Sequence, residues 1–357
     1  MRFFGGESES IFLKSGVLNY SHVPENVLFR DDERSVIAEC VKPLLRGQKA
    51  YNLFIHGDPG LGKTLCSLDI IRKLEDYSGD VKCVYINCWD SSREYQALVD
   101  VGKALGYFFY QGKSSDDVFR EIVKRVERIK GLVLVLDEVD KLRDTSFIYR
   151  FADALEGKVS LILIANDKDF LLSLEPRIVS RLSVDDLHFK AYSLQEVKEI
   201  LKARCSQAFR PGAFSDLLLN RVVRETYNAC DIRVGLFLLL RSVRIAESNE
   251  RSKVEQGDVD VALKKLSEFR IKTSLSKLSE SEQIIIGLVS ASQGLVSGMV
   301  FEEYVKEGGK LTKRSFRRSL EKLERLGLLR TEFTGKGVRG QTRKIFLGGK
   351  LKYTKLN

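Results

Sequence analysis

Apolar strands alternate with amphipathic helices along the first half of the chain. Apolar, β-prone runs predict strands at residues 52–56, 81–89, 131–138 and 160–166, with a weaker final strand at 182–189. Apolar residues at helical spacing predict helices over 31–45, 65–74, 91–105, 115–129 and 147–155. The runs at 131–138 and 160–166 are apolar at almost every position, which is typical of strands buried on both faces. This alternation predicts a parallel α/β sheet with helices on both sides.

From residue 193 the pattern is helical throughout, with predicted helices over 197–205, 214–229, 232–248 and 258–271. A polar stretch at 272–278 is expected to be a linker. Three further helices are predicted over 283–291, 299–307 and 312–326, followed by hairpin strands at 328–332 and 343–347. Three helices followed by a hairpin predict a winged helix. The expected domains are an α/β nucleotide-binding domain at 1–191, an all-α lid at 192–272 and a winged-helix domain at 273–357.

The segment that joins the first strand to its helix reads GDPGLGKT, which is the pattern of a phosphate-binding P-loop. Its glycines let backbone N–H groups turn towards an anion, and the following helix adds its positive end. Lys63 can reach the β- and γ-phosphates, and the Thr64 hydroxyl can hold Mg²⁺. A glycine-rich turn without a ligand is the alternative interpretation. The predicted nucleotide-binding residues here are Gly57, Asp58, Pro59, Gly60, Leu61, Gly62, Lys63, Thr64 and Leu65.

Polar side chains follow two of the predicted buried strands. The strand at 131–138 ends in Asp137 and Glu138, which is the Walker B pattern of a P-loop protein. Asp137 would orient Mg²⁺ through its water shell, and Glu138 would polarise an attacking water. Asn166 ends the strand at 160–166, where it could help to place the same water or could simply form a turn.

Three arginines are candidate cations for the γ-phosphate: Arg177, Arg181 and Arg233. The guanidinium group is planar, permanently charged and well suited to phosphate. Each of them could equally be a solvated surface residue.

Almost all of the net charge lies in the last quarter of the chain. The chain has a formal charge of +10, and residues 275–357 contain 17 Lys and Arg against 8 Glu, a net charge of +9. Basic residues occupy the N-terminal half of the helix at 312–326, as in a major-groove reader: Lys313, Arg314, Arg317 and Arg318. The hairpin adds Lys336, Arg339, Arg343 and Lys344. We therefore expect double-stranded DNA as a partner, although a winged helix can also dock proteins.

Other classes of site have little support in the sequence. The chain has 357 residues, of which 43% are hydrophobic and 30% charged, as in a soluble protein of two or three domains. It has no apolar run near the roughly 20 residues of a membrane helix and no signal-peptide layout, so we expect a cytoplasmic, nucleoid-associated protein and no membrane partner. The six cysteines form no CxxC pair and the three histidines are scattered, so no zinc site is expected.

Taken together, these motifs resemble those of the archaeal origin-recognition/cell-division-cycle replication initiators of the AAA+ class. The resemblance covers essentially the whole chain and rests on VPENVLFRDDE, GDPGLGKT, VLDEVDKL, IAND, LEPRIVSRL, AYSLQEVKEIL, DIRVGLFLLLRS and GKGVRGQTRKIFL. It implies an initiator that recognises origin DNA, with bound ATP or ADP and Mg²⁺ acting as a slow switch and only weak ATPase activity. It also implies the MCM helicase and a paralogous initiator as partners.

The resemblance further implies roles for individual residues. Those near the adenine and ribose would be Val23, Pro24 and Arg30. Tyr192 and Arg204 would close over the nucleotide from the lid. Asn166 would be sensor 1, Arg233 would be sensor 2, and Arg181 would act on the ATP of a neighbouring subunit. Residues 91–112 would include an insertion that touches DNA. Two positions depart from the family pattern: Cys230 replaces a usual Gly of the sensor 2 stretch, and Asp58 replaces a common Pro.

Two other functions fit the same motifs. A P-loop ATPase of the STAND or helicase-loader type would act on proteins, and its DNA affinity would not depend on the basic wing. An ATP-gated transcription regulator would occupy promoters rather than replication origins.

Overall fold

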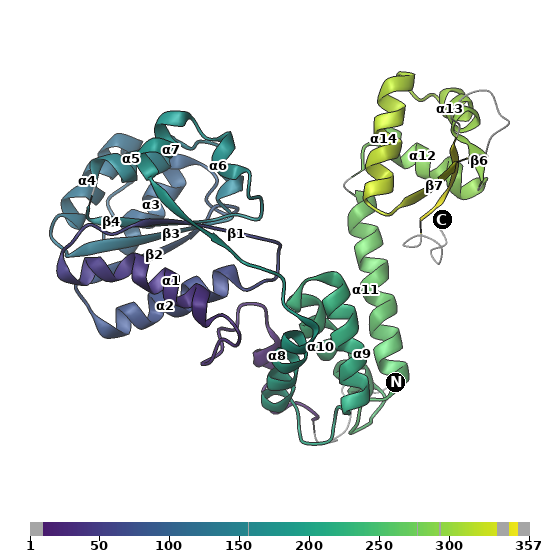
Figure 1. The fold of residues 1–357 in the computed structure, drawn as a ribbon, viewed down its shortest axis with the longest axis horizontal. Coiled ribbons are helices and arrows are strands. Elements are labelled where there is room, and N and C mark those ends of the chain that lie inside the picture. The colour runs from purple at the N-terminus through teal and green to yellow at the C-terminus, as the bar shows by residue number, and fades with distance from the viewer. Residues whose placement is uncertain (1–9, 156, 277, 293, 334–342, 349–357) are drawn as a thin grey trace. The chain divides into compact units, whose positions relative to one another are not determined.

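In the computed structural model of this chain, the described residues are 10–155, 157–276, 278–292, 294–333 and 343–348 (Figure 1). The chain forms two compact units, and the boundary between them along the sequence falls between Glu255 and Gln256. The first unit contains the expected α/β domain and three of the expected lid helices, whereas the fourth, predicted over 258–271, is part of a helix of the second unit.

A five-stranded sheet forms the centre of the first unit (Figure 1). Its strands are β1 (Asn52–His56), β2 (Val81–Asn87), β3 (Gly131–Asp137), β4 (Val159–Ile164) and β5 (Val184–His188). Their order across the sheet is β2-β3-β4-β1-β5, and every neighbouring pair is parallel. All residues of β3 and β4 are buried, which confirms the prediction of strands covered on both faces. The weak final strand is confirmed as β5, at the edge of the sheet.

Helices cover both faces of the sheet, with α1 and α2 on one side and α3, α4, α5 and α7 on the other (Figure 1). Their bounds are α1 Asp31–Val41, α2 Lys63–Tyr77, α3 Glu94–Ala104, α4 Ser115–Val126, α5 Ser146–Ala154, α6 Phe170–Ser173 and α7 Pro176–Leu182. The two short helices α6 and α7 were not predicted, because neither is long enough to show a helical period. Helix α1 ends before Pro43 and continues as a 3₁₀ turn over Lys42–Arg46, since proline lacks the N–H that an α-helix needs.

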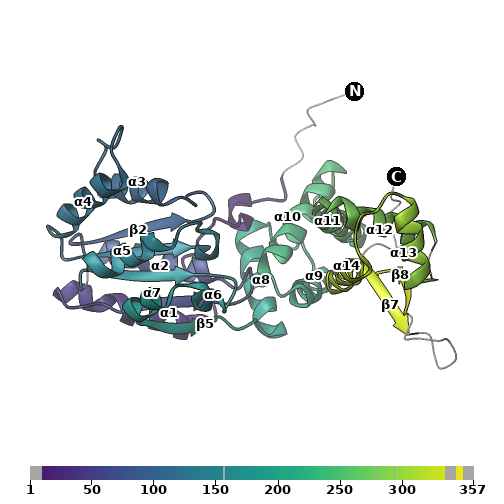
Figure 2. The same cartoon turned by 90° about the horizontal axis from the view of Figure 1, so that it is seen from above.

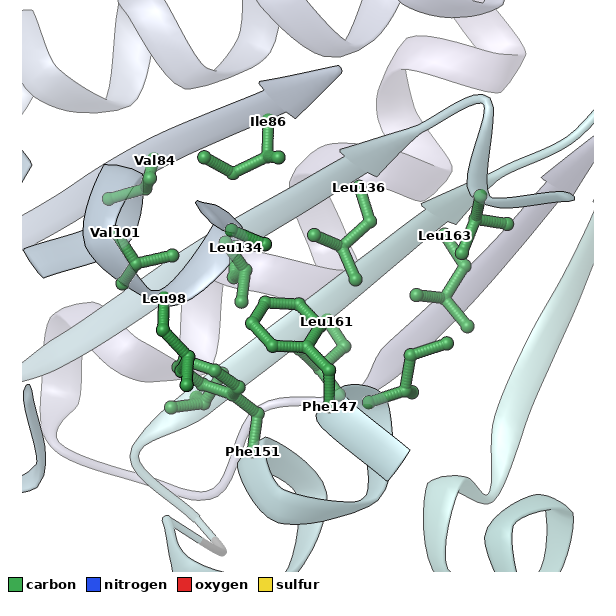
Figure 3. Close-up of a cluster of buried hydrophobic side chains, with 14 of the residues drawn as sticks. Val84, Ile86, Leu98, Val101, Leu134, Leu136, Phe147, Phe151, Leu161 and Leu163 are labelled. Carbon is green, nitrogen blue, oxygen red and sulfur yellow. The ribbon is translucent and has the colours of Figure 1, made fainter. Parts of the chain in front are cut away.

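The largest apolar core lies between the sheet and the α3–α5 layer (Figure 3). Alternate residues of β3 and β4 point into it, because successive side chains of a strand face opposite sides. Leu134 and Leu161 meet Phe147 and Phe151 of α5 there, and all four side chains are fully buried. This packing fixes the positions of the carboxyl ends of the strands, where the predicted functional residues lie.

Three longer helices follow the sheet within the first unit: α8 (Leu194–Ala208), α9 (Asp216–Ala229) and α10 (Ile232–Ser248). A capping box begins α8, because Ser193 and Glu196 each accept a hydrogen bond from the other's backbone N–H. The N-terminal segment packs on this helical layer. The Leu13 N–H donates to Ala208 O at 2.8 Å, and the Ile11 N–H donates to Glu247 Oε1 at 2.7 Å.

The second unit consists of helices and a small antiparallel sheet (Figure 2). Its elements are α11 (Gln256–Ser276), α12 (Glu280–Ala291), β6 (Leu295–Val296), α13 (Ser297–Lys306), α14 (Lys313–Arg325), β7 (Leu329–Phe333) and β8 (Arg343–Leu347). The strand order is β6-β8-β7, and the two-residue strand β6 was not predicted. The predicted linker at 272–278 is wrong over 272–276, where α11 continues because neither Pro nor Gly interrupts it.

One side of α14 forms the core of the second unit. Phe316, Leu320 and Leu323 are buried there, together with Tyr304 of α13 and residues of α12 and β8. Leu326 does not share this apolar side, because it is the C-cap of the helix and is 38% exposed.

Glu282 connects α12 to α14. It completes a capping box by accepting a hydrogen bond from the Ser279 N–H at 2.9 Å, and it forms an ion pair with Lys322, whose Nζ lies 2.8 Å from Oε1 and donates a hydrogen bond to Oε2 at 3.1 Å. Burial raises the pKa of the Glu282 carboxyl, but the Lys322 and Ser279 hydrogen bonds outweigh this effect and leave the pKa lowered. A carboxyl whose pKa is lower in the folded state stabilises that state above its unfolded pKa.

We expect Glu282→Gln to lower the free energy of unfolding of the second unit by about 1–2 kcal/mol at pH 7, through loss of the charged cap and ion pair. The difference from the wild type should shrink as the pH falls below about 4, where the wild-type carboxylate takes up a proton. Calorimetric unfolding of the full chain at both pH values would measure it. The matched control is Glu303→Gln, which breaks an exposed pair with Lys306 on α13 and should be close to neutral. Equal effects of the two variants would contradict the role of Glu282.

Candidate functional site

A cavity of about 530 Å³ lies in the first unit, at the carboxyl ends of β1, β3 and β4. The loop after β1, the start of α2, a segment of residues 19–28 and side chains of α8 and α10 all line it. Strands that are far apart in sequence end together here because parallel strands have their carboxyl ends at one edge of a sheet.

The loop between β1 and α2 requires glycine at two positions of close approach. Gly57 has φ +140°, and a Cβ there would lie 2.6 Å from Phe189 O. Gly60 has φ +79°, and a Cβ there would lie 1.9 Å from Asp231 Oδ1. Any other residue would push the loop away from these neighbours, so the glycines both shape the loop and allow the start of α10 to reach it.

Lys63 is the first residue of α2 and is buried, with 6% of its surface exposed. Its Nζ donates to Gly57 O at 2.6 Å, to Asp58 O at 2.9 Å and to Asn166 Oδ1 at 2.9 Å. Burial lowers the pKa of the Lys63 amine, and the nearby Asp137 opposes this effect. The structure therefore brings two predicted site residues, Lys63 and Asn166, into direct contact at the loop.

Asp137 ends β3 and is held by three hydrogen bonds. Thr64 Oγ1 donates to its Oδ2 at 2.6 Å, Tyr85 OH donates to the same oxygen at 2.8 Å, and the Glu138 N–H donates to Oδ1 at 2.9 Å. Tyr85 was not among the predicted site residues, because a tyrosine inside a β-prone run carries no distinguishing signal. Burial raises the pKa of the Tyr85 phenol, so this group remains a hydrogen-bond donor.

Thr64 and Asp137 together provide a hydroxyl and a carboxylate of the kind that Mg²⁺ prefers. Across the described part of the chain, no three His, Cys, Asp or Glu side chains form a cluster that could hold a metal ion. The pair still fits Mg²⁺, because this ion keeps several waters and is completed by phosphate oxygens.

Glu138 follows Asp137 with a left-handed backbone, φ +52° and ψ +43°. This conformation is uncommon for a residue with a side chain and costs about 1–3 kcal/mol, which the buried strand before it must offset. Glu138 lines the cavity together with Asn166 and Arg233. The structure thus brings together the predicted catalytic residues except Arg181.

The predicted lid residues Tyr192 and Arg204 line the cavity, as do Val23 and Pro24. Burial raises the pKa of Tyr192 to about 12. Arg204 Nη1 donates to Val17 O at 3.1 Å, which attaches the N-terminal segment to α8.

Arg30 lies behind this wall and does not line the cavity. Its guanidinium carbon is 4.0 Å from the centre of the Tyr192 ring, and its Nη2 donates to Lys190 O at 2.7 Å. Arg30 therefore supports Tyr192 and is not placed beside a bound base.

Arg181 and Arg177 are both on α7, outside the cavity. Arg181 Nε lies 3.1 Å from Asp153 Oδ1, and Arg177 Nε lies 2.9 Å from Glu175 Oε2. Neither side chain reaches the P-loop of its own chain.

In the second unit, α14 turns its basic residues to solvent, opposite its buried apolar side. A shallow hollow on this face is lined by Lys313, Arg314, Arg317, Arg318 and Glu321. On β8, Lys344 is exposed and Arg343 Nη1 lies 3.9 Å from Glu324 Oε2. Lys336 and Arg339 lie outside the described residues.

The chain matches two family models, an AAA domain over residues 46–171 and a Cdc6 AAA+ ATPase-type lid domain over residues 198–264. An ORC1-type DNA replication protein 1 of Sulfurisphaera tokodaii is 30% identical, with 94% of this chain and 90% of that protein aligned. This chain belongs to the family of ORC1-type DNA replication proteins. The ORC1-type DNA replication protein of Cenarchaeum symbiosum is 28% identical over 95% of this chain and 89% of that protein.

The fold of this ORC1-type chain also matches a solved relative. The structure of the Aeropyrum pernix ORC1 protein in complex with DNA has a TM-score of 0.74 and 27% identity, and the match covers 95% of this chain and 94% of that one. The family and the AAA+ fold with its helical lid, which the motifs predicted, are thereby confirmed. Within the residues that the structure describes, no helix combines the length and the apolar character needed to span a membrane.

Cys230, which was expected from the resemblance to stand where the family has Gly, ends α9 in a left-handed conformation with φ +50° and ψ +30°. A side chain there costs roughly 1–2 kcal/mol, whereas glycine adopts this geometry freely. The substitution therefore affects the turn that leads into Asp231 and α10.

We expect Cys230→Gly to raise the free energy of unfolding by about 0.5–1 kcal/mol, after the entropy that glycine adds to the unfolded chain is deducted. The matched control is Cys205→Gly inside α8, which should lower it by about 1 kcal/mol or more because glycine disfavours a helix interior. Chemical denaturation followed by circular dichroism measures both. A loss of stability in both variants would contradict the strain at Cys230.

Proposed function

We propose that this ORC1-type chain is a replication initiator that binds ATP or ADP with Mg²⁺ and recognises double-stranded origin DNA. The convergence of Lys63, Asn166, Thr64, Asp137 and Arg233 on one cavity supports the nucleotide. These residues come from three strand ends and a helix beyond the sheet, and a core alone gives no reason for such polar groups to meet.

The site fits a nucleoside triphosphate in each of its parts. Apolar residues such as Val23, Pro24 and Ile200 line the end that would receive the adenine. At the other end, the loop N–H groups and Lys63 would bind the phosphates, which are stronger acceptors than the loop carbonyls that Lys63 now contacts. When bound, Mg²⁺ supplies positive charge to the phosphate oxygens, and Thr64 and Asp137 would hold it.

Hydrolysis would depend on two polar groups next to the phosphate end. Glu138 would accept a proton from the attacking water, and Asn166 would orient that water while it also fixes Lys63. We propose that this reaction is slow and acts as a switch between ATP and ADP states. Arg181 lies outside its own cavity and would act on the nucleotide of a neighbouring subunit, such as a paralogous initiator.

We propose that the second unit is a winged helix that reads DNA. Its order of α12, β6, α13, α14 and a β7–β8 hairpin is that of this fold, and α14 occupies the place of the recognition helix. The hollow with four basic residues on the exposed face of α14 fits DNA better than a protein partner, because a polyanion offsets its excess charge. The Aeropyrum pernix relative was solved in complex with DNA. We further propose that the chain works at the nucleoid and helps to recruit the MCM helicase.

Lys63→Ala should lower ATP affinity by about 100-fold or more, because the variant cannot form the charge-assisted hydrogen bonds to the phosphates. Titration with a fluorescent ATP analogue measures the affinity, and circular dichroism verifies the fold. The matched control is Lys73→Ala on the same helix, where the half-exposed side chain pairs with Asp69 and should not affect binding. Retention of ATP by the Lys63 variant would refute the nucleotide assignment.

The double variant Arg314→Ala, Arg317→Ala should weaken the binding of duplex origin DNA and flatten its salt dependence. The slope of log K against log salt should fall by about 0.9 for each phosphate that the variant no longer neutralises. Binding isotherms at several salt concentrations give the slope, with Arg325→Ala at the far end of α14 as the control. The Arg325→Ala control should keep the wild-type slope. If the double variant also keeps it, this face of α14 does not bind DNA and a protein-docking role is favoured.

A further inference from the structure

Asp231, the residue before α10, holds the side chain of Arg233. Its Oδ1 accepts the Arg233 backbone N–H at 2.9 Å, which caps the helix. The same carboxylate accepts hydrogen bonds from the Arg233 guanidinium, from Nε at 3.0 Å and 3.1 Å and from Nη2 at 2.9 Å. One carboxylate therefore fixes both the helix start and the cation that faces the cavity.

The Asp231 carboxylate also lies against the P-loop. A Cβ on Gly60 would be 1.9 Å from Asp231 Oδ1 and 3.0 Å from Asp231 Cα, so the two backbones are in close contact. An anion beside a loop proposed to bind polyphosphate is electrostatically unfavourable, so its position there calls for a specific role.

The charge of Arg233 acts inside the same site. Its positive charge contributes to lowering the pKa of Lys63, and Glu138 contributes to raising the pKa of Arg233, although the Asp231 hydrogen bond is the largest cause of that shift. Arg233 is thus close enough to affect the groups around the phosphate position while its guanidinium stays paired with Asp231.

We propose that Asp231 is a specificity-determining residue that competes with the γ-phosphate for Arg233 and so sets the preference of the site for ATP over ADP. This inference rests on the proposed nucleotide binding. A γ-phosphate offers a guanidinium the same two-point geometry as a carboxylate and more negative charge. ADP has no γ-phosphate, so the Asp231–Arg233 pair stays intact when ADP binds and must break only for ATP.

The solvent exposure of the Asp231–Arg233 pair supports this competition, which we call the Asp231 latch. The Arg233 side chain is 48% exposed and that of Asp231 is 22% exposed. A pair so open to water is weak enough for a phosphate to displace, whereas a buried pair would be costly to break.

The test is Asp231→Asn in the full chain, freed of nucleotide. Asparagine caps helices as well as aspartate does, so α10 should still form, but its amide carries no charge to hold Arg233. Dissociation constants for ADP and a non-hydrolysable ATP analogue, both with Mg²⁺, would be measured by calorimetry. The preference for the ATP analogue over ADP should rise by about three- to tenfold. The matched control is Asp216→Asn in the first turn of α9, which should leave the preference unchanged.

Two further variants separate the latch from simple charge repulsion. Arg233→Ala should lower the preference for the ATP analogue, and adding Asp231→Asn to it should change that preference no further. Equal tightening of ADP and the analogue by Asp231→Asn would overturn the inference, because repulsion alone would explain it. A lower preference for the analogue would also overturn it, since Asp231 would then be aiming Arg233 at the phosphate. A wild-type chain that binds neither nucleotide would instead refute the proposed function.

Discussion

The strand order of the sheet brings Lys63 and Asn166 into hydrogen-bonding distance. The other polar groups of the site are positioned by the same strand order. β1 pairs with β4, with Leu53 opposite Ile162, so the loop after β1 and the residue after β4 leave the same edge side by side. β3 lies on the other side of β4 and adds Asp137 to that edge. Because β3 and β4 are buried along their whole length, the edge is rigid, and small polar side chains can meet across long sequence separations.

The lid helices α8 and α10 contact the loop and the N-terminal segment at the carboxyl end of the sheet. Gly60 admits Asp231, and Arg204 attaches the N-terminal segment whose residues line the cavity. A ligand in this cavity therefore touches the sheet edge, the lid helices and the N-terminal segment at once. If the proposed nucleotide binds here, a change in its phosphates that moves Arg233 would also move the start of α10, because Asp231 caps that helix and holds Arg233.

The second unit separates its core from its charge by a simple helical rule. On α14, Phe316, Leu320 and Leu323 recur at helical spacing and are buried, while the basic residues between them remain in water. The charge is thus available to a polyanion at no cost in packing. Glu282, buried in the first turn of α12, forms an ion pair with Lys322 of α14, and this lysine does not line the basic hollow.

The sequence alone was sufficient for the longer elements, the family and half of the residues that line the cavity. Strand β1 has its predicted bounds, and the P-loop and Walker B residues meet as expected, because these signals are local and each depends on only a few adjacent residues. Short elements such as α6, α7 and β6 escaped prediction, since two to seven residues show no period. Tyr85, the position of Arg30 behind Tyr192 and the Asp231 contact with Gly60 were decided by the tertiary structure alone. Each of these contacts joins residues far apart in the chain, and their distance depends on strand order and helix packing, which no local pattern encodes.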